Sequence, residues 1–268
     1  MLPCVVVTNA VSLHAGLQED TRAMIDRELD VQTRDGLMNT FITYPEEGGP
    51  FPVVLFYMDA PGKREELHAM ARRIGAVGYY VVLPNLYYRS ERNFVVDPAD
   101  PARKRMFDLM NSLNTKLVNE DTQAILDFVV GEEQASPGPI GCVGYCMSGP
   151  FVLSAAAEFA PRMRAAASFY GVRLCTDAPD SPHRTAHKIT GELYVACAET
   201  DVWAPKEMID ALDAHLKTTK INYRIEWYPG THHGFAFPLR PAAYDMRAAE
   251  RHWERIHALF ERNLKHAH

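Results

Sequence analysis

The chain has 268 residues, of which 47% are hydrophobic, and its formal net charge is −6. This length and composition are typical of one large α/β domain with a substantial core. No block of Lys and Arg is present to neutralise phosphates, so the sequence argues against nucleic-acid binding. No apolar run reaches the roughly 18 residues that a membrane-spanning helix needs, and no membrane partner is expected.

Residues 1–23 contain a short apolar patch but neither a positive leader nor a clear cleavage site. We therefore expect a flexible N-terminal extension there rather than a signal peptide, followed by a single domain over residues 24–268. The five cysteines are odd in number and have no regular spacing, which favours free thiols in a cytoplasmic protein. No Cys or His grouping has the spacing of zinc ligands, and no metal is expected.

Hydrophobic patterns predict strands and helices in alternation. The Asp35-Gly36 pair within residues 30–44 indicates a β-hairpin. Buried strands are expected at 53–57, 79–83, 140–143, 165–170, 192–198 and 223–228, and helices at 63–77, 102–113, 119–130, 151–160, 206–217 and 242–264. Residues 84–101 have no regular pattern and predict a long loop. This order predicts an α/β fold with a mostly parallel sheet, whose ligands bind beyond the carboxyl ends of the strands.

The segment Gly144-Tyr145-Cys146-Met147-Ser148-Gly149 joins an apolar strand to an alanine-rich helix. A strand, a Gly-x-nucleophile-x-small-Gly turn and a helix form a nucleophile elbow, in which small residues let strand and helix approach closely. Cys146 holds the nucleophile position, where the helix dipole favours a thiolate. The structural alternative is a tight turn that contains a small apolar cysteine.

Three reactive residues follow three separate predicted strands, in the order Cys146, Asp201 and His233. This order of nucleophile, acid and histidine is typical of α/β-hydrolases. We expect His233 to take the Cys146 proton or to pair with the thiolate, while Asp201 orients the imidazole. The backbone N–H groups of Met147 and Ala60 are the expected oxyanion-hole donors. Asp201 could instead cap the following helix, and His233 could be an ordinary loop residue.

These motifs resemble those of the dienelactone hydrolase family. The resemblance rests on Gly144-Tyr145-Cys146, on Tyr228-Pro229-Gly230 leading into His233-Gly234-Phe235, and on Gly78-Tyr79 followed by the segment 84–89. It covers about Asp30 to Leu264. It implies an α/β-hydrolase fold, a Cys-His-Asp triad, no cofactor, and hydrolysis of a small-molecule enol-lactone or related ester through an acyl-thioester. A monomer or a homodimer is expected.

The sequence departs from the family pattern at positions near the substrate. Asp59 stands where the archetypal enzyme has a glutamate that contacts the resting thiol, and it either gates Cys146 or forms an Asx-turn before Pro61. Phe237 stands where that enzyme has a carboxylate-binding arginine. Lys104 lies near the position of the second such arginine, in a basic cluster that is also typical of a solvated helix face.

Aromatic side chains near the expected site favour an apolar or aromatic acyl or lactone group in the substrate. The candidates for substrate contact are five aromatic residues and one arginine: Tyr88, Tyr145, Trp203, Phe235, Phe237 and Arg89. A lactone or activated-ester hydrolase is the first interpretation. A carboxylesterase or thioesterase acting on a neutral or aromatic ester is the alternative, because no arginine stands at position 237. A non-catalytic thiol protein that senses oxidants or binds a carbonyl ligand is the third.

Overall fold

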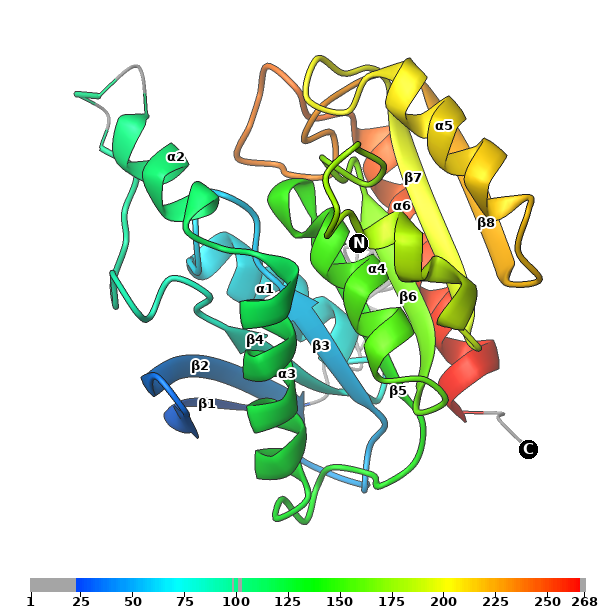
Figure 1. Ribbon diagram of the computed structural model, residues 1–268. Helices are drawn as coiled ribbons and strands as arrows, with labels where there is room; N and C mark the ends of the chain where they lie inside the picture. The colour runs from blue at the N-terminus through cyan, green and yellow to red at the C-terminus, as the bar shows by residue number, and fades with distance from the viewer. Residues whose placement is uncertain (1–22, 98, 101–102, 266–268) are drawn as a thin grey trace, which may run out of the picture.

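The computed structural model describes residues 23–97, 99–100 and 103–265, so all but one residue of the expected N-terminal extension lies outside the described part. Eight strands form one sheet in the order β1-β2-β4-β3-β5-β6-β7-β8 (Figure 1). The strands are β1 (Met24–Thr33), β2 (Gly36–Pro45), β3 (Val53–Tyr57), β4 (Tyr80–Pro84), β5 (Ile140–Tyr145), β6 (Met163–Phe169), β7 (Glu192–Thr200) and β8 (Asn222–His232). The helices are α1 (Glu65–Gly75), α2 (Lys104–Asn111), α3 (Thr115–Val129), α4 (Gly149–Glu158), α5 (Lys206–Leu216) and α6 (Met246–Phe260), with short helical turns η1 (Cys146–Ser148), η2 (Pro182–Lys188) and η3 (Glu261–Lys265).

The sheet is mixed but mostly parallel, as the alternation of elements predicts. Strands β1 and β2 form the expected antiparallel hairpin, and β2 pairs antiparallel with β4. From β4 across to β8 every neighbouring pair is parallel. The carboxyl ends of these parallel strands therefore meet at one edge of the sheet, where ligands bind in such folds.

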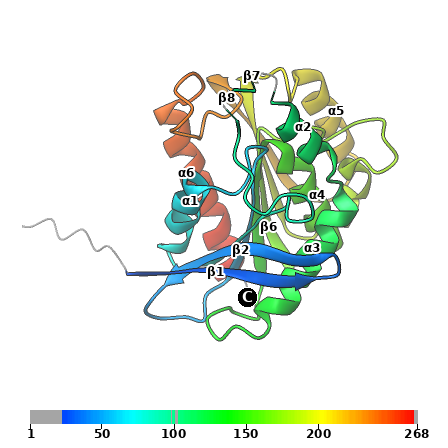
Figure 2. The same ribbon diagram turned by 90° about the vertical axis from the view of Figure 1, so that its left-hand side faces the viewer.

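Helices cover both faces of the sheet. Helices α1 and α6 lie on one face, and α3, α4 and α5 lie on the other (Figure 2). The central strands β3, β4 and β5 are buried along their whole length, which explains why they are continuous apolar runs rather than alternating ones. The core consequently lies in two layers, one on each side of the parallel strands.

Strands β7 and β8 extend beyond their predicted ends, 198 and 228. Their pairing passes a register shift and ends with Thr200 beside His232. The extension was missed because the final residues of both strands are polar or belong to a Pro-Gly pair, so the apolar pattern stops early. The finding matters because it places the next residues of the two strands, Asp201 and His233, at neighbouring positions.

Two further segments differ from the sequence-based expectation. Helix α3 begins at Thr115 rather than at 119, because the Asn114 side chain caps it by accepting a hydrogen bond from the Leu117 N–H at 2.9 Å. The turn η2 lies in the segment between β6 and β7, for which the sequence predicts no helix. The long loop after β4 is irregular, as predicted, and the buried Asn85 amide ties its base to Asn39 at 2.9 Å.

Candidate active site

The turn between β5 and α4 has the backbone of a nucleophile elbow. Cys146 has a φ of 55°, in the left-handed region that non-glycine residues seldom occupy. Such a conformation costs of order 1–3 kcal/mol and concentrates at functional sites. The Ser148 hydroxyl donates a hydrogen bond to the Met58 carbonyl and so fastens the turn to the end of β3. Cys146 itself is partly exposed, whereas Met147 and Ser148 are buried.

Small residues let this turn form. A Cβ added to Gly144 would lie 2.7 Å from a methyl group of Val152, and one added to Gly149 would lie 2.4 Å from the Cα of Gly171. Both distances are shorter than real carbon contacts, so no larger side chain fits unless the backbone moves. The glycines thus let strand β5 and helix α4 approach closely, as the sequence predicts. They also bring α4 against the loop after β6 at Gly171, which the sequence did not indicate.

Asp201 and His233 meet at the ends of β7 and β8. Asp201 Oδ2 accepts a hydrogen bond from His233 Nδ1 at 2.7 Å, and the Asp201 side chain is 1% exposed. Asp201 Oδ1 accepts hydrogen bonds from the backbone N–H groups of Trp203 and Ala204, at 2.9 and 3.1 Å. Helix α5 begins only at Lys206, so Asp201 orders the loop that leads to the helix and is not its cap.

The surroundings of His233 favour its protonated form. Burial of the ring lowers the pKa of His233, but the hydrogen-bonded Asp201 carboxylate and the nearby Cys146 sulfur outweigh this effect and raise the pKa to about 9. The ring of Tyr170 meets the imidazole edge-to-face at 5.1 Å between centroids. Tyr170 has a φ of 38° at the end of β6, and sequence reasoning missed it because nothing in the local pattern marks a strained tyrosine. An imidazolium beside a cysteine can pair with a thiolate.

The Tyr87 side chain contacts both residues whose N–H groups are the candidate oxyanion donors. The Tyr87 hydroxyl donates a hydrogen bond to the Ala60 carbonyl at 2.8 Å and lies 3.1 Å from the Met147 sulfur. Tyr87 thus links the turn after β3 to the turn after β5. Ala60 and Met147 are both almost fully buried, at 4% and 3% exposure. Buried, pre-positioned backbone N–H groups are the donors that stabilise a developing oxyanion.

Asp59 is fully buried and is paired with two arginines. Arg64 Nη1 lies 2.5 Å from Asp59 Oδ1, and Arg240 donates to Oδ2 of the same carboxylate. Both guanidinium groups lie over the Phe237 ring, at 5.4 and 4.3 Å from its centroid. The Asp59 carbonyl accepts the Gly62 N–H at 2.9 Å, so the turn predicted here uses the backbone while the carboxylate binds arginine.

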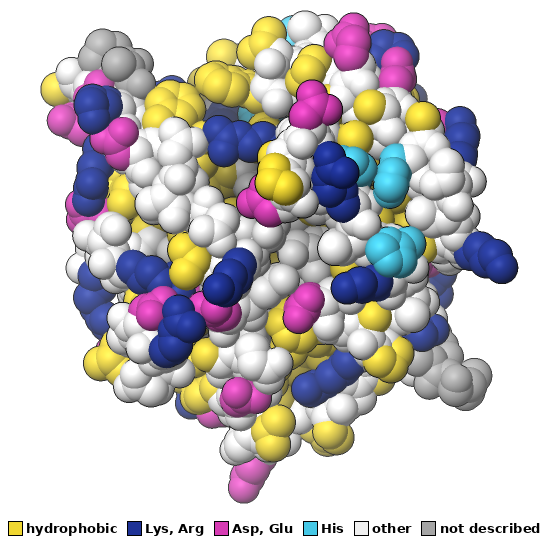
Figure 3. Space-filling view, in the orientation of Figure 1, with side chains coloured by type: hydrophobic (Ala, Val, Ile, Leu, Met, Phe, Trp, Pro, Cys, Tyr) yellow, Lys and Arg dark blue, Asp and Glu magenta, His cyan; other side chains and the backbone are white. Residues whose placement is uncertain are grey.

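A cavity of about 690 Å³ opens beside His233. Five cationic side chains line it, and its one carboxylate is Glu66; the cations are Lys63, Arg64, Arg92, Arg103 and Arg240. Phe94 and Trp203 supply apolar wall, and Trp203 is 55% exposed. On the face of the molecule in Figure 3, basic and acidic side chains are interspersed. The sequence does not reveal these arginines as a group, because they come from distant segments of the chain. Arg240, for example, lies 181 residues from its partner Asp59.

Several side chains expected to contact substrate do not line this cavity. The Tyr88 hydroxyl contacts Thr33 and Asp121, at 2.6 and 2.9 Å. Arg89 binds both Asp121 oxygens at 2.8 Å and also pairs with Asp35. These two side chains fasten the loop after β4 to the hairpin and to α3, so they are structural.

The remaining candidates divide between core and surface. Tyr145 is fully buried, and its hydroxyl lies 2.7 Å from His252 Nε2. Phe235 and Phe237 have no exposed surface and pack in the core, where Phe237 supports the two arginines. Lys104 is 79% exposed and pairs with Asp108 on the same helix, whereas the neighbouring Arg103 lines the cavity. Of the aromatic candidates, Trp203 lines the cavity.

A strained cysteine turn and a paired histidine and aspartate, at the carboxyl edge of a mostly parallel sheet, define a hydrolase of the α/β-hydrolase class. The pattern that characterises the dienelactone hydrolase family matches residues 38–264, and the chain belongs to that family. It is thus a hydrolase of the dienelactone hydrolase type, as the motifs predicted. Within the described residues, no helix is both long and apolar enough to cross a bilayer.

Individual relatives agree with this assignment. A protein of Synechocystis sp. named "Putative carboxymethylenebutenolidase" is 26% identical over 232 residues, which cover 84% of this chain and 92% of the relative. An Escherichia coli K12 protein with the same name is 27% identical and covers 79% of this chain and 77% of its own. The crystal structure of a dienelactone hydrolase homologue from Klebsiella pneumoniae superposes with a TM-score of 0.78 at 22% identity, covering 89% of this chain and 98% of that one.

A dienelactone hydrolase-like promiscuous phosphotriesterase from metagenomic libraries has a TM-score of 0.76 at 21% identity. The match covers 90% of this chain and 99% of that one. At this level of sequence identity, similarity to a solved structure shows that the two proteins share a fold and nothing more. The fold prediction is confirmed.

Proposed function

We propose that the chain hydrolyses an enol-lactone or an activated ester through a triad of Cys146, His233 and Asp201. The observation that carries the proposal is the environment of His233. Its Nδ1 lies 2.7 Å from the Asp201 carboxylate, and Asp201 and Cys146 together raise its pKa to about 9. A structural cysteine in a tight turn gives no reason for a buried imidazole to be held beside it in this way.

The proposed reaction begins with attack of the Cys146 thiolate on the carbonyl carbon. The oxyanion that forms is stabilised by the N–H groups of Met147 and Ala60. Collapse of the tetrahedral intermediate breaks the carbon–oxygen bond, and protonated His233 gives its proton to the leaving oxygen. Neutral His233 then takes a proton from a water molecule that attacks the thioester, which releases the acid and restores the thiolate. Asp201 keeps the imidazole in the productive tautomer throughout.

The cavity beside His233 favours a substrate that carries an acidic group. Five of its side chains are cations, although the chain as a whole has a net charge of −6. A carboxylate that enters would meet Arg240 and Arg64, which lie over the Phe237 ring. The relatives named carboxymethylenebutenolidase point in the same direction. The apolar wall at Phe94 and Trp203 supports an aromatic or neutral ester as the second candidate.

Replacement of the nucleophile tests the proposal. Cys146→Ala is expected to lower kcat on p-nitrophenyl acetate and on an acidic enol-lactone by about 10³-fold. Cys175→Ala is the matched control, because Cys175 is also a partly exposed free cysteine. It should leave both activities unchanged, and mass spectrometry should find an acyl group on wild-type Cys146 during turnover.

Two results would argue against the mechanism. Equal activity of Cys146→Ala and wild type would remove Cys146 from the reaction. A stable adduct on Cys146 with no turnover of any lactone or ester would favour the non-catalytic thiol protein instead. If both esters react but the acidic lactone has no advantage in kcat/KM, the neutral-ester alternative is the better description of the substrate.

A further inference from the structure

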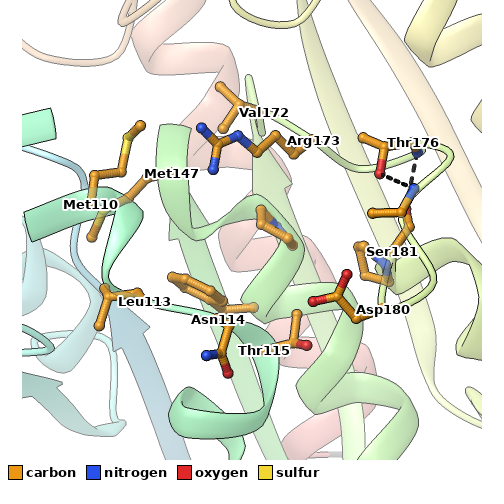
Figure 4. Close-up of a pocket in the computed structure, with 14 residues that line it drawn as sticks. Met110, Leu113, Asn114, Thr115, Met147, Val172, Arg173, Thr176, Asp180 and Ser181 are labelled. Carbon is orange, nitrogen blue, oxygen red and sulfur yellow. Dashed lines mark hydrogen bonds between the residues drawn. The ribbon is translucent and has the colours of Figure 1, made fainter. Parts of the chain in front are cut away.

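A second cavity, of about 210 Å³, adjoins the nucleophile elbow and shares no lining residue with the cavity of His233. It lies between the end of α2, the starts of α3 and α4, and the loop that follows β6 (Figure 4). Ligand pockets that enclose a whole drug-sized molecule usually measure about 300–1,000 Å³. This cavity is therefore of a size to take one fragment of a ligand.

Two direct links join this cavity to the nucleophile. Met147 follows Cys146 in the chain, and Met147 is one of the lining residues. Val172 also lines the cavity, and its backbone N–H donates a hydrogen bond to the Cys146 carbonyl at 3.0 Å. A group bound here would thus lie next to the residue whose N–H is the proposed oxyanion donor.

The wall of the cavity carries both apolar and polar side chains. The apolar members include Met110, Leu113, Met147, Phe151 and Val172. The polar members come from the start of α3 and from the loop after β6, and include Asn114, Thr115, Thr176 and Asp180. The apolar side chains suit the hydrocarbon part of a ligand fragment.

Arg173 bridges one side of the cavity. Its backbone has a φ of 54°, and its guanidinium donates a hydrogen bond to Asn111 Oδ1 on α2 at 3.0 Å. Figure 4 shows the side chain extending from the loop toward the Met147 side of the cavity. A strained backbone at Arg173 costs free energy, and the contact it allows joins the loop to α2 across the cavity.

The proposed reaction at Cys146 indicates which part of the substrate, the leaving group or the acyl group, each of the two cavities binds. The group that protonates the leaving oxygen must lie beside it, so the leaving group belongs in the cavity that His233 lines. The substituent on the carbonyl carbon then points away from His233. Resting on the proposed triad mechanism, we infer that the cavity of Met147 and Val172 is the acyl subsite. It takes a short unbranched or planar apolar acyl group, which stays there while bound to Cys146 as the thioester.

A series of p-nitrophenyl esters with one leaving group and increasing acyl length tests the inference. Each methylene buried in an apolar site improves binding about three- to fourfold, so wild-type kcat/KM should rise about tenfold from acetate to butanoate. It should fall again for decanoate, which exceeds the cavity. Because the leaving group is constant, the profile reports the acyl side alone.

Leu113→Trp fills the cavity from the segment between α2 and α3. It should lower kcat/KM for butanoate at least tenfold while acetate stays within about twofold of wild type. Leu37→Trp is the matched control, since Leu37 is 52% exposed on the hairpin, and it should leave the whole profile unchanged. Ala178→Trp, on the exposed loop at the same cavity, gives a second filling variant should Leu113→Trp fail to fold.

The outcomes separate the subsite from the mechanism. If Cys146→Ala keeps wild-type activity, the proposed function fails and the subsite with it. If activity depends on Cys146 but a folded filling variant changes all esters by one factor, or changes none, the acyl subsite is overturned while the mechanism stands. A loss that grows with acyl length supports it.

Discussion

His233 Nδ1 donates a hydrogen bond to Asp201 Oδ2 at 2.7 Å, across the ends of two strands that pair up to the preceding residues. Asp201→Asn should therefore lower kcat on p-nitrophenyl acetate by about 10²- to 10⁴-fold, because an amide favours the wrong imidazole tautomer. Stability should fall at neutral pH as well, because the neutral amide no longer stabilises the protonated His233 ring, although its oxygen can still accept from the Trp203 and Ala204 N–H groups. Asp210→Asn, at an exposed pair on α5, is the control. Wild-type kcat in Asp201→Asn would contradict the proposed role.

The stability of the protein should depend on pH through His233. Its pKa is about 9 in the folded protein, against 6.5 for an unperturbed histidine side chain, so folding favours the protonated ring. The corresponding stabilisation is fully present below about pH 6.5 and is lost as the pH rises through about 9. Relative to His233→Asn, the free energy of unfolding of wild type should fall by about 3 kcal/mol over this range. Urea unfolding at a series of pH values measures it, and parallel curves for the two proteins would exclude the effect.

Arg89 should matter for stability and not for substrate binding. Arg89→Met leaves the Asp121 carboxylate, which is 1% exposed, without its cationic partner. Removing one member of a buried ion pair costs about 3 kcal/mol, so the unfolding midpoint should shift markedly while KM of the folded enzyme stays constant. Arg34→Met removes a 71% exposed guanidinium from the same region and should cost less than about 1 kcal/mol. A raised KM in Arg89→Met would restore Arg89 as a substrate contact.

Arg240 should determine the preference for acidic substrates. Charge-assisted hydrogen bonds contribute about 1.5–3 kcal/mol, so Arg240→Met should raise KM for an acidic enol-lactone at least tenfold. The KM for p-nitrophenyl acetate should stay within about twofold, since Arg64 still pairs with Asp59. Lys104→Met is the matched control, because Lys104 is exposed and does not line the cavity. Equal changes in KM for both substrates would assign Arg240 a structural role only.

The elements of the fold and the elbow were predictable from local sequence. Buried parallel strands are continuous apolar runs, and the glycines around Cys146 have the spacing that a strand–turn–helix contact requires. Asp201 and His233 were identified by their order after two strands, and the structure pairs them. These signals involve residues close in the chain, or a topology that places strand ends together.

The surroundings of the site were much less predictable. An aromatic residue beside Cys146 or His233 in the sequence is close to the site along the chain, but the sequence does not tell on which face its side chain lies. Tyr145 and Phe235 are therefore expected in the pocket, although both are core residues. The pairing of Asp59 with Arg240 leaves no local pattern, because it depends on how two distant loops meet. The presence of Phe237 in place of an arginine therefore does not tell whether the cavity is positively charged.

Backbone contacts hold the turn that carries Cys146. The Cα of Gly171 occupies the space that a side chain on Gly149 would need, and the Val172 N–H donates a hydrogen bond to the Cys146 carbonyl. These backbone contacts therefore do not depend on whether the side chain at position 146 carries sulfur or oxygen. Exchanging sulfur for oxygen, as in Cys146→Ser, alters the chemistry and leaves the scaffold intact, whereas an alanine at Gly149 or Gly171 would dismantle the scaffold and leave the reactive atom in place. The nucleophile and the backbone that positions it can therefore be changed independently of each other by mutation.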